Sequence, residues 1–177
     1  MVYTMRIYTD GGCRGNGKRG AIGAAAAVFK AKFGRSIPWV EALPRYPTPT
    51  NQRAEITAII IAIERALERY EELDTRPRLN VTIYSDSRYA VDCMTKLIYK
   101  WTRNGWINAH GYPVANQDLL KKASDLDDQL SELGSVEYIW IPREQNSEAD
   151  RYCNEKMDEE YRWFYLYDSD TDSDSDW

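Results

Sequence analysis

Apolar and polar residues alternate over short distances in the first part of the chain. The β-branched and aromatic run at residues 2–9 and the short apolar runs at residues 21–29 and 36–43 predict three strands. Within the second run, alanine at residues 24–27 also suits a helix, but the nearby glycines and the β-patterned neighbours favour a strand. A loop rich in proline follows at residues 43–50.

Helical spacing of apolar residues begins at Asn51 and predicts a long amphipathic helix over residues 51–73. The remaining expected elements are, in chain order, a strand at 79–86, a helix at 87–101, a glycine- and asparagine-rich excursion at 102–113, a helix at 116–133, a strand at 135–141, a polar loop at 142–146 and a helix at 147–164. Asn116 is expected to cap the helix that starts there. This order predicts an α/β fold, with a mixed sheet covered by helices on both faces.

Net charge is unevenly distributed along the 177 residues. The last ten residues hold five of the 28 acidic side chains, so residues 1–167 carry 28 − 5 = 23 acidic groups against 23 Lys and Arg. The overall charge of −5 therefore does not exclude a nucleic-acid partner for a formally neutral body. We expect one domain over residues 1–167 and an acidic, disordered tail over residues 168–177.

The sequence lacks the patterns typical of zinc-binding, disulfide-bonded and membrane-spanning proteins. The three cysteines and the single histidine, His110, form no zinc or disulfide pattern. No uncharged run approaches the roughly 20 residues of a membrane span, so we expect no membrane partner. The expected location is intracellular, in the cytoplasm or the nucleus.

Four carboxylates stand at the ends of expected elements. Asp10 and Asp86 are expected to end strands, while Glu55 and Asp150 lie in the first turns of helices. Each alone is explained by turn chemistry, a helix dipole or a solvated helix face. If the four converge at one edge of the sheet, their repulsion requires cations, and a site of oxygen ligands suits Mg²⁺ or Mn²⁺.

The chain resembles type 1 ribonuclease H over roughly residues 3–157. The matching segments are "YTDGGCRGNG", "TNQRAEITAIIIAIE", "VTIYSDSRYAVDCMTKLIYKWTRNGW" and "NSEADRYCNEKM". The resemblance implies the ribonuclease H-like fold, a five-stranded mixed sheet of three antiparallel and two parallel strands. It also implies an endoribonuclease that cuts the RNA strand of RNA–DNA hybrids and leaves 5′-phosphate and 3′-hydroxyl ends. By the same resemblance, two Mg²⁺ ions, or Mn²⁺, are held by Asp10, Glu55, Asp86 and Asp150.

The resemblance also implies contacts to both strands of a hybrid. On the RNA side these are the Cys13 backbone, Asn16, Asn51 and Gln52, which would read 2′-hydroxyls. On the DNA side they are Thr50 and Asn116 in a phosphate pocket and Trp101 in a channel, with Lys96, Lys100 and Arg103 attracting phosphates. Turn formation by Asn16, capping by Asn51 and helix packing by Trp101 and Trp106 are the alternatives.

Some positions depart from the family pattern. Thr48 and Leu97 stand where many relatives have arginine and tryptophan, and the short loop before Asp150 lacks the usual histidine. His110 does not align with it, and Arg143, Glu144 and Gln145 are the polar residues available in that loop. An alternative is therefore a weakly active or non-catalytic hybrid-binding protein. A proofreading-type exonuclease requires an Asp-x-Glu on the first strand, where this chain has Asp10-Gly11-Gly12, and we expect a monomer.

Overall fold

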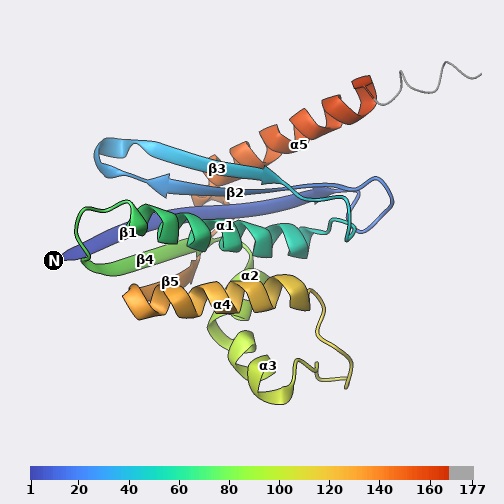
Figure 1. Ribbon diagram of the computed structural model, residues 1–177. Helices are drawn as coiled ribbons and strands as arrows, with labels where there is room; N and C mark the ends of the chain where they lie inside the picture. The colour runs from blue at the N-terminus through green and yellow to red at the C-terminus, as the bar shows by residue number, and fades with distance from the viewer. Residues whose placement is uncertain (168–177) are drawn as a thin grey trace, which may run out of the picture.

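Five strands form one mixed sheet in the order β3-β2-β1-β4-β5 (Figure 1). The strands are β1 (Val2–Arg14), β2 (Ile22–Lys30), β3 (Ser36–Ala42), β4 (Arg78–Ser85) and β5 (Gly134–Trp140). The first three pair antiparallel, and β4 and β5 are added parallel to β1. This computed structural model describes residues 1–167, so the expected acidic tail lies outside the described residues. The predicted fold class, including the mixture of strand directions, is confirmed.

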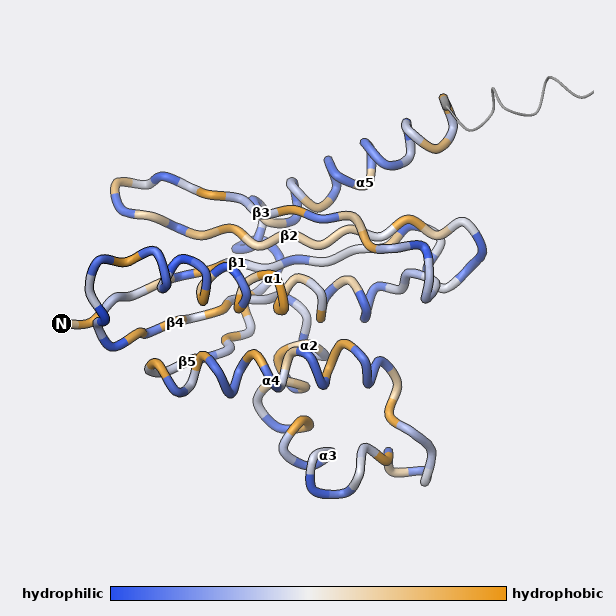
Figure 2. Tube along the Cα trace, viewed as in Figure 1, coloured by the Kyte–Doolittle hydropathy of each residue, from blue (hydrophilic) through white to orange (hydrophobic). Residues whose placement is uncertain are grey.

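The alanine-rich run forms strand β2, as predicted, and it is apolar along nearly its whole length (Figure 2). Its side chains alternate between the two faces of the sheet. Ala25 and Ala27 belong to the main core, whereas Ala24 and Ala26 pack with Cys153 and Met157 on the other face. Small side chains on both faces let helices pack closely on each side of this strand.

Helices cover both faces of the sheet. They are α1 (Asn51–Glu71), α2 (Arg88–Asp92), α3 (Ile98–Asn104), α4 (Gln117–Leu133) and α5 (Ser147–Tyr167), with short 3₁₀ turns at Lys32–Gly34 and Arg143–Gln145. Helix α1 packs on β1, β2 and α4, and the main core lies between these helices and the sheet. Helix α5 packs on β1, β2 and β3 from the opposite face and then projects beyond the sheet (Figure 1).

The expected helix at residues 87–101 is interrupted. A π-helical turn, Cys93–Leu97, separates α2 from α3, which continues to Asn104. A wider turn shifts the buried face of the helix, and here Ala90 is buried before it, Met94 within it and Trp101 after it. Local helix propensity does not encode such a turn. No helix within residues 1–167 has the length and apolar character needed to cross a bilayer.

Candidate active site

Asp10 lies inside strand β1, not at its end as predicted, because β1 continues to Arg14 through pairing with β2. The neighbouring Gly11 explains how α1 reaches this strand. A Cβ atom on Gly11 would lie 2.2 Å from the backbone carbon of Ala54 and 2.4 Å from the nitrogen of Glu55. Glycine therefore permits a backbone contact that places Glu55 of α1 beside Asp10.

Three of the four predicted carboxylates converge. One oxygen each of Asp10, Glu55 and Asp86 lies within 4.8 Å of the others, although they come from β1, α1 and the residue after β4. Asp150, in the first turn of α5, lines the same cavity of about 470 Å³. The fold therefore brings all four acids to one cavity, with Asp150 at its wall rather than within the closest group.

Burial and mutual repulsion raise the pKa of two of these carboxyls. The pKa of Asp10 rises to about 7, chiefly because the group is desolvated and then because Asp86 and Asp150 are near. The pKa of Glu55 rises to about 9 through desolvation and the proximity of Asp10 and Asp86. Such a cluster has a strong electrostatic demand for cations.

The donor set fits a hard divalent cation. The converging groups are all carboxylates, and oxygen ligands are those that Mg²⁺ and Mn²⁺ prefer. The Oε2 atom of Glu55 is buried and has no hydrogen-bond partner among the described residues. A buried carboxylate oxygen without a partner costs free energy, and a metal ion at this point would satisfy it.

Asn146 orients Asp86 from the short loop before α5. Its side chain is buried, and Nδ2 donates to Oδ1 of Asp86 at 3.0 Å and to the backbone oxygen of Thr9 at 2.9 Å. Indole Nε1 of Trp140 donates to the backbone oxygen of Asp86 at 3.0 Å. Sequence reasoning missed both residues, since neither the burial of a polar loop residue nor the hydrogen-bond partner of a tryptophan at the end of a strand is apparent before the fold is known.

Besides Arg14, the carboxylate cavity is lined by the basic residue Arg143. Its Nη2 atom donates to Oδ1 of Asp150 at 3.2 Å, and most of its side chain is exposed. Its positive charge opposes the rise in the pKa of both Asp10 and Glu55. The other two polar residues expected in this loop, Glu144 and Gln145, do not line the cavity.

Three of the four expected RNA-side residues form one hydrogen-bonded cluster at the start of α1. The backbone nitrogen of Cys13 donates to Oδ1 of Asn51 at 2.9 Å, and the backbone nitrogen of Asn51 donates to Oδ1 of Asn16 at 2.8 Å. Thr50, rather than Asn51, is the N-cap of α1, accepting from the nitrogen of Arg53 at 3.1 Å. The loop after β1 is thereby fixed to the end of α1, with Asn16 and Asn51 exposed.

Asn116 joins α4 to this cluster but does not cap its helix, contrary to the sequence expectation. Its φ of 62° is left-handed, and its side chain makes no cap hydrogen bond. Instead Nδ2 of Asn116 lies 3.3 Å from Oε1 of Gln52 and 3.2 Å from the hydroxyl of Tyr89. Gln52 and Asn116 therefore share one polar surface.

Trp101, the residue expected in a DNA channel, is almost completely buried. Trp101 is 9% exposed and packs against Trp106 with ring centroids 6.0 Å apart, which favours the packing alternative. Lys96 pairs with Asp92, whereas Lys100 and Arg103 are exposed on α3. His110 is exposed on the excursion after α3 and does not line the carboxylate cavity.

Comparison with protein families finds a match to the RNase H model over residues 3–159. A ribonuclease H of Clostridium botulinum is 32% identical over 158 residues, covering 86% of this chain and 95% of that protein. A ribonuclease H of Salmonella paratyphi C is 31% identical over 173 residues, covering 98% of this chain and 96% of that protein. The region matched by the family model contains all four acids.

Solved structures show the same architecture. LC9-RNase H1, described as a type 1 RNase H with the type 2 active-site motif, aligns with a TM-score of 0.63 and 27% identity, covering 86% of this chain and 69% of that one. A foamy viral protease-reverse transcriptase solved with an RNA/DNA hybrid aligns with a TM-score of 0.68 and 20% identity, covering 86% of this chain and 20% of that one. The second likeness concerns the fold alone.

Proposed function

This chain belongs to the ribonuclease H family, and from this premise we propose that it cuts the RNA strand of RNA–DNA hybrids with two divalent metal ions at the four-carboxylate cavity. The products would carry 5′-phosphate and 3′-hydroxyl ends. The observation that carries the proposal is the convergence of Asp10, Glu55 and Asp86 within 4.8 Å beside Asp150. Bound Mg²⁺ or Mn²⁺ would supply an activated water and stabilise charge on the scissile phosphate and the leaving 3′ oxygen.

The chain's own residues prepare this site in three ways. Asp10, Glu55, Asp86 and Asp150 would hold the cations. Asn146 holds Asp86 in place, so little reorganisation of that carboxylate is needed when substrate arrives. Arg143 would attract the phosphate at the rim, where its guanidinium remains largely exposed beside Asp150.

Choice of substrate would rest on the cluster at the start of α1. An RNA strand presents 2′-hydroxyls in a wide, shallow minor groove, and short amides can reach them there. Asn16, Asn51 and Gln52 are exposed and lie on adjoining elements. The same surface is supported by the Cys13 backbone, Thr50 and Asn116. Trp101 would act mainly by packing α3 against the core.

The second candidate is a hybrid-binding protein with weak or no catalysis. The departure that favours it is the absence of a histidine from the loop before Asp150. Arg143 occupies the rim in that loop, but an arginine keeps its proton and would not serve as a proton shuttle. The two candidates differ in turnover rather than in binding.

A cleavage assay with the full chain separates them. RNA labelled at its 5′ end and annealed to DNA is incubated with Mg²⁺, with Mn²⁺ and with EDTA, and an RNA duplex and a DNA duplex serve as controls. We expect the RNA of the hybrid to be cut with either metal and not in EDTA. In a parallel reaction with RNA labelled at its 3′ end, removal of a phosphate from the new 5′ ends by phosphatase would establish the end chemistry.

Asp10→Asn distinguishes binding from catalysis in this assay. Removing one anionic ligand weakens the cation site but leaves Asn16, Asn51 and Gln52, the exposed residues proposed to contact the hybrid, unchanged. We expect cleavage to be lost while hybrid binding largely persists. Hybrid binding by the wild-type protein without cleavage in either metal would favour the non-catalytic candidate, and equal turnover by Asp10→Asn would refute metal catalysis at this cavity.

A further inference from the structure

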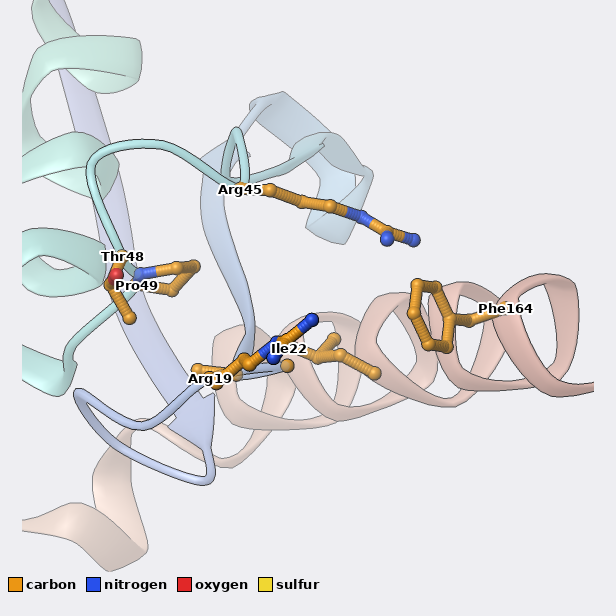
Figure 3. Close-up of a pocket in the computed structure, with 8 residues that line it drawn as sticks. Arg19, Ile22, Arg45, Thr48, Pro49 and Phe164 are labelled. Atoms are coloured by element: carbon orange, nitrogen blue, oxygen red, sulfur yellow. The ribbon is translucent and has the colours of Figure 1, made fainter. Parts of the chain in front are cut away.

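A second cavity of about 470 Å³ lies between the loop before α1, the loop after β1 and the far part of α5 (Figure 3). Its side-chain lining combines two guanidinium groups and a hydroxyl with an apolar wall. The residues are Arg19, Arg45, Thr48, Ile22, Pro49 and Phe164. None of the described residues lining the cavity is acidic, so the chemistry of the lining suits an anion attached to an apolar body.

Both arginines are available for a ligand. Within residues 1–167, neither Arg19 nor Arg45 forms an ion pair with a carboxylate, and both are exposed. The guanidinium of Arg45 stacks over the ring of Phe164 at 3.8 Å, as the side chains in Figure 3 show. Stacking limits the motion of the guanidinium while its N–H groups, which lie in its plane, stay free for phosphate oxygens.

One acidic residue lies nearby. Glu160, one turn before Phe164 on α5, lines a smaller adjoining cavity together with Arg45. Its carboxylate is 3.5 Å from Nζ of Lys156, which also lies 3.1 Å from Glu159 and so offsets only part of the charge, leaving at most one negative charge near the two arginines. The balance at the larger cavity therefore remains positive.

The cavity adjoins the proposed RNA-side surface. Thr48 and Pro49 line it, and Thr50 and Asn51 follow directly along the chain. The backbone oxygen of Pro49 accepts from the nitrogen of Gly17 at 2.9 Å, which fixes the loop that carries Arg19 to the same segment. A duplex contacting Asn16 and Asn51 would thus have phosphates close to this cavity.

We propose that this cavity is an additional nucleic-acid subsite, in which Arg19 and Arg45 bind a phosphodiester of the hybrid and Ile22, Pro49 and Phe164 contact the attached sugar. This inference rests on the proposed function. The family match ends at residue 159, so Phe164 lies outside the matched region, whereas Ile22 and Pro49 lie inside it. The subsite would add affinity and salt dependence without contributing to chemistry at the carboxylates.

The test compares two double variants. Arg19→Gln/Arg45→Gln removes both charges from the subsite. Lys32→Gln/Arg35→Gln removes two exposed charges at the turn between β2 and β3, at the other end of the sheet (Figure 1). Binding of a fluorescent RNA–DNA hybrid is measured by anisotropy in EDTA over a salt series, and kcat and KM are measured with Mg²⁺.

For Arg19→Gln/Arg45→Gln we expect hybrid affinity to fall roughly tenfold near 50 mM salt and the slope of log K against log[salt] to decrease by about 2, as for two lost phosphate contacts. We expect kcat to stay the same and KM to rise. The control variant should show less than half of this loss. Phe164→Ala should weaken binding when Arg45 is present and have little effect in the double variant.

Unchanged affinity and salt slope in Arg19→Gln/Arg45→Gln, or losses equal to those of the control, would overturn the subsite. Tighter binding by that variant would also overturn it and would point to the acidic segment 168–177 as the occupant. Binding in EDTA does not need catalysis. If the wild-type protein fails to cut the hybrid, that result would count against the proposed function. The binding measurements in EDTA would still test the subsite.

Discussion

At the scale of single residues, burial makes the ionised forms of Asp10 and Glu55 unfavourable when no cation is bound. Asp10 is 7% exposed and its pKa is raised to about 7, from an ordinary value of 3.8. When folding raises the pKa of a carboxyl, the native state binds that proton more tightly than the unfolded state does. Its contribution to stability is full below the unfolded pKa and is lost as pH rises towards the folded pKa.

We therefore expect Asp10→Asn to melt at a higher temperature than the wild-type protein when metal is absent. At pH 8 the gain should be roughly 3–6 °C, and it should shrink at pH 5, where the native Asp10 is already protonated. Thermal melts in EDTA at the two pH values measure this, with Asp125→Asn on the exposed face of α4 as control. Mg²⁺ should raise the melting temperature of the wild type and not of Asp10→Asn; a gain that is the same at pH 5 and pH 8 would contradict the argument.

Asn146 shows how a residue outside the carboxylate set can govern it. Asn146→Ala removes the bonds to Asp86 and to the oxygen of Thr9. We expect kcat/KM on the hybrid to fall about 10–100-fold, the range for lost partners of metal ligands, and stability to fall by about 1–3 kcal/mol. Gln145→Ala, at the exposed neighbouring position, should change neither. Full activity of Asn146→Ala would show that Asp86 needs no such support.

At the scale of secondary-structure elements, the loop after β1, α4 and the carboxylate cavity meet at the N-terminal end of α1. Asn51 bonds to Cys13 and Asn16, and Gln52 bonds to Asn116. Asn51→Ala/Gln52→Ala should lower hybrid cleavage at least tenfold through KM, because two groups proposed to contact the 2′-hydroxyls are lost. The melting temperature should fall only by the effect of about two exposed hydrogen bonds, those from Cys13 to Asn51 and from Asn116 to Gln52.

The matched control for this variant is Gln129→Ala, which removes an exposed amide from α4 away from the cluster. Steady-state kinetics on the hybrid and thermal melts of all three proteins measure the effect. Kinetics unchanged from the wild type in a well-folded double variant would remove both residues from the substrate surface.

The elements differ in how far the sequence predicts them. Alternation and helical spacing are local properties, so the strands and the long helix α1 were predicted from them. The extension of β1 past Asp10 depends on pairing with β2, and the π-helical turn at Cys93–Leu97 depends on packing. Neither is encoded locally. Asn116 likewise adopts a left-handed conformation because tertiary partners, not its own helix, satisfy its side chain.

The candidate site divides in the same way. The four acids were expected from their places near element ends and from the family resemblance, and the fold brings them to one cavity. Asn146, Trp140 and Phe164 could not be assigned, because their roles arise from the loop before α5, the end of β5 and the far part of α5 meeting other elements in space. Residue type and spacing carry no record of such contacts.

At the scale of the whole molecule, the uneven distribution of charge bears on how strongly the protein binds nucleic acid. Residues 1–167 are formally neutral, and the five acidic groups of residues 168–177 account for the net charge of −5. A nucleic acid and an acidic segment of the same chain are both polyanions drawn to basic side chains, and salt screens both attractions. We regard weak competition between them as a hypothesis, with a spectator segment as its alternative.

Deleting residues 168–177 tests this hypothesis. If the segment competes for the basic surface, the shortened protein should bind a labelled hybrid more tightly than the full chain at low ionic strength, and the difference should shrink as salt rises. Anisotropy in EDTA over a salt series measures both proteins. A variant of the full chain with the five aspartates changed to asparagine keeps the length while removing the charge, so it should match the deletion if charge is the cause. Identical affinities across the series would make the acidic segment a spectator, whereas a difference that persists at high salt would indicate a contact that does not depend on charge.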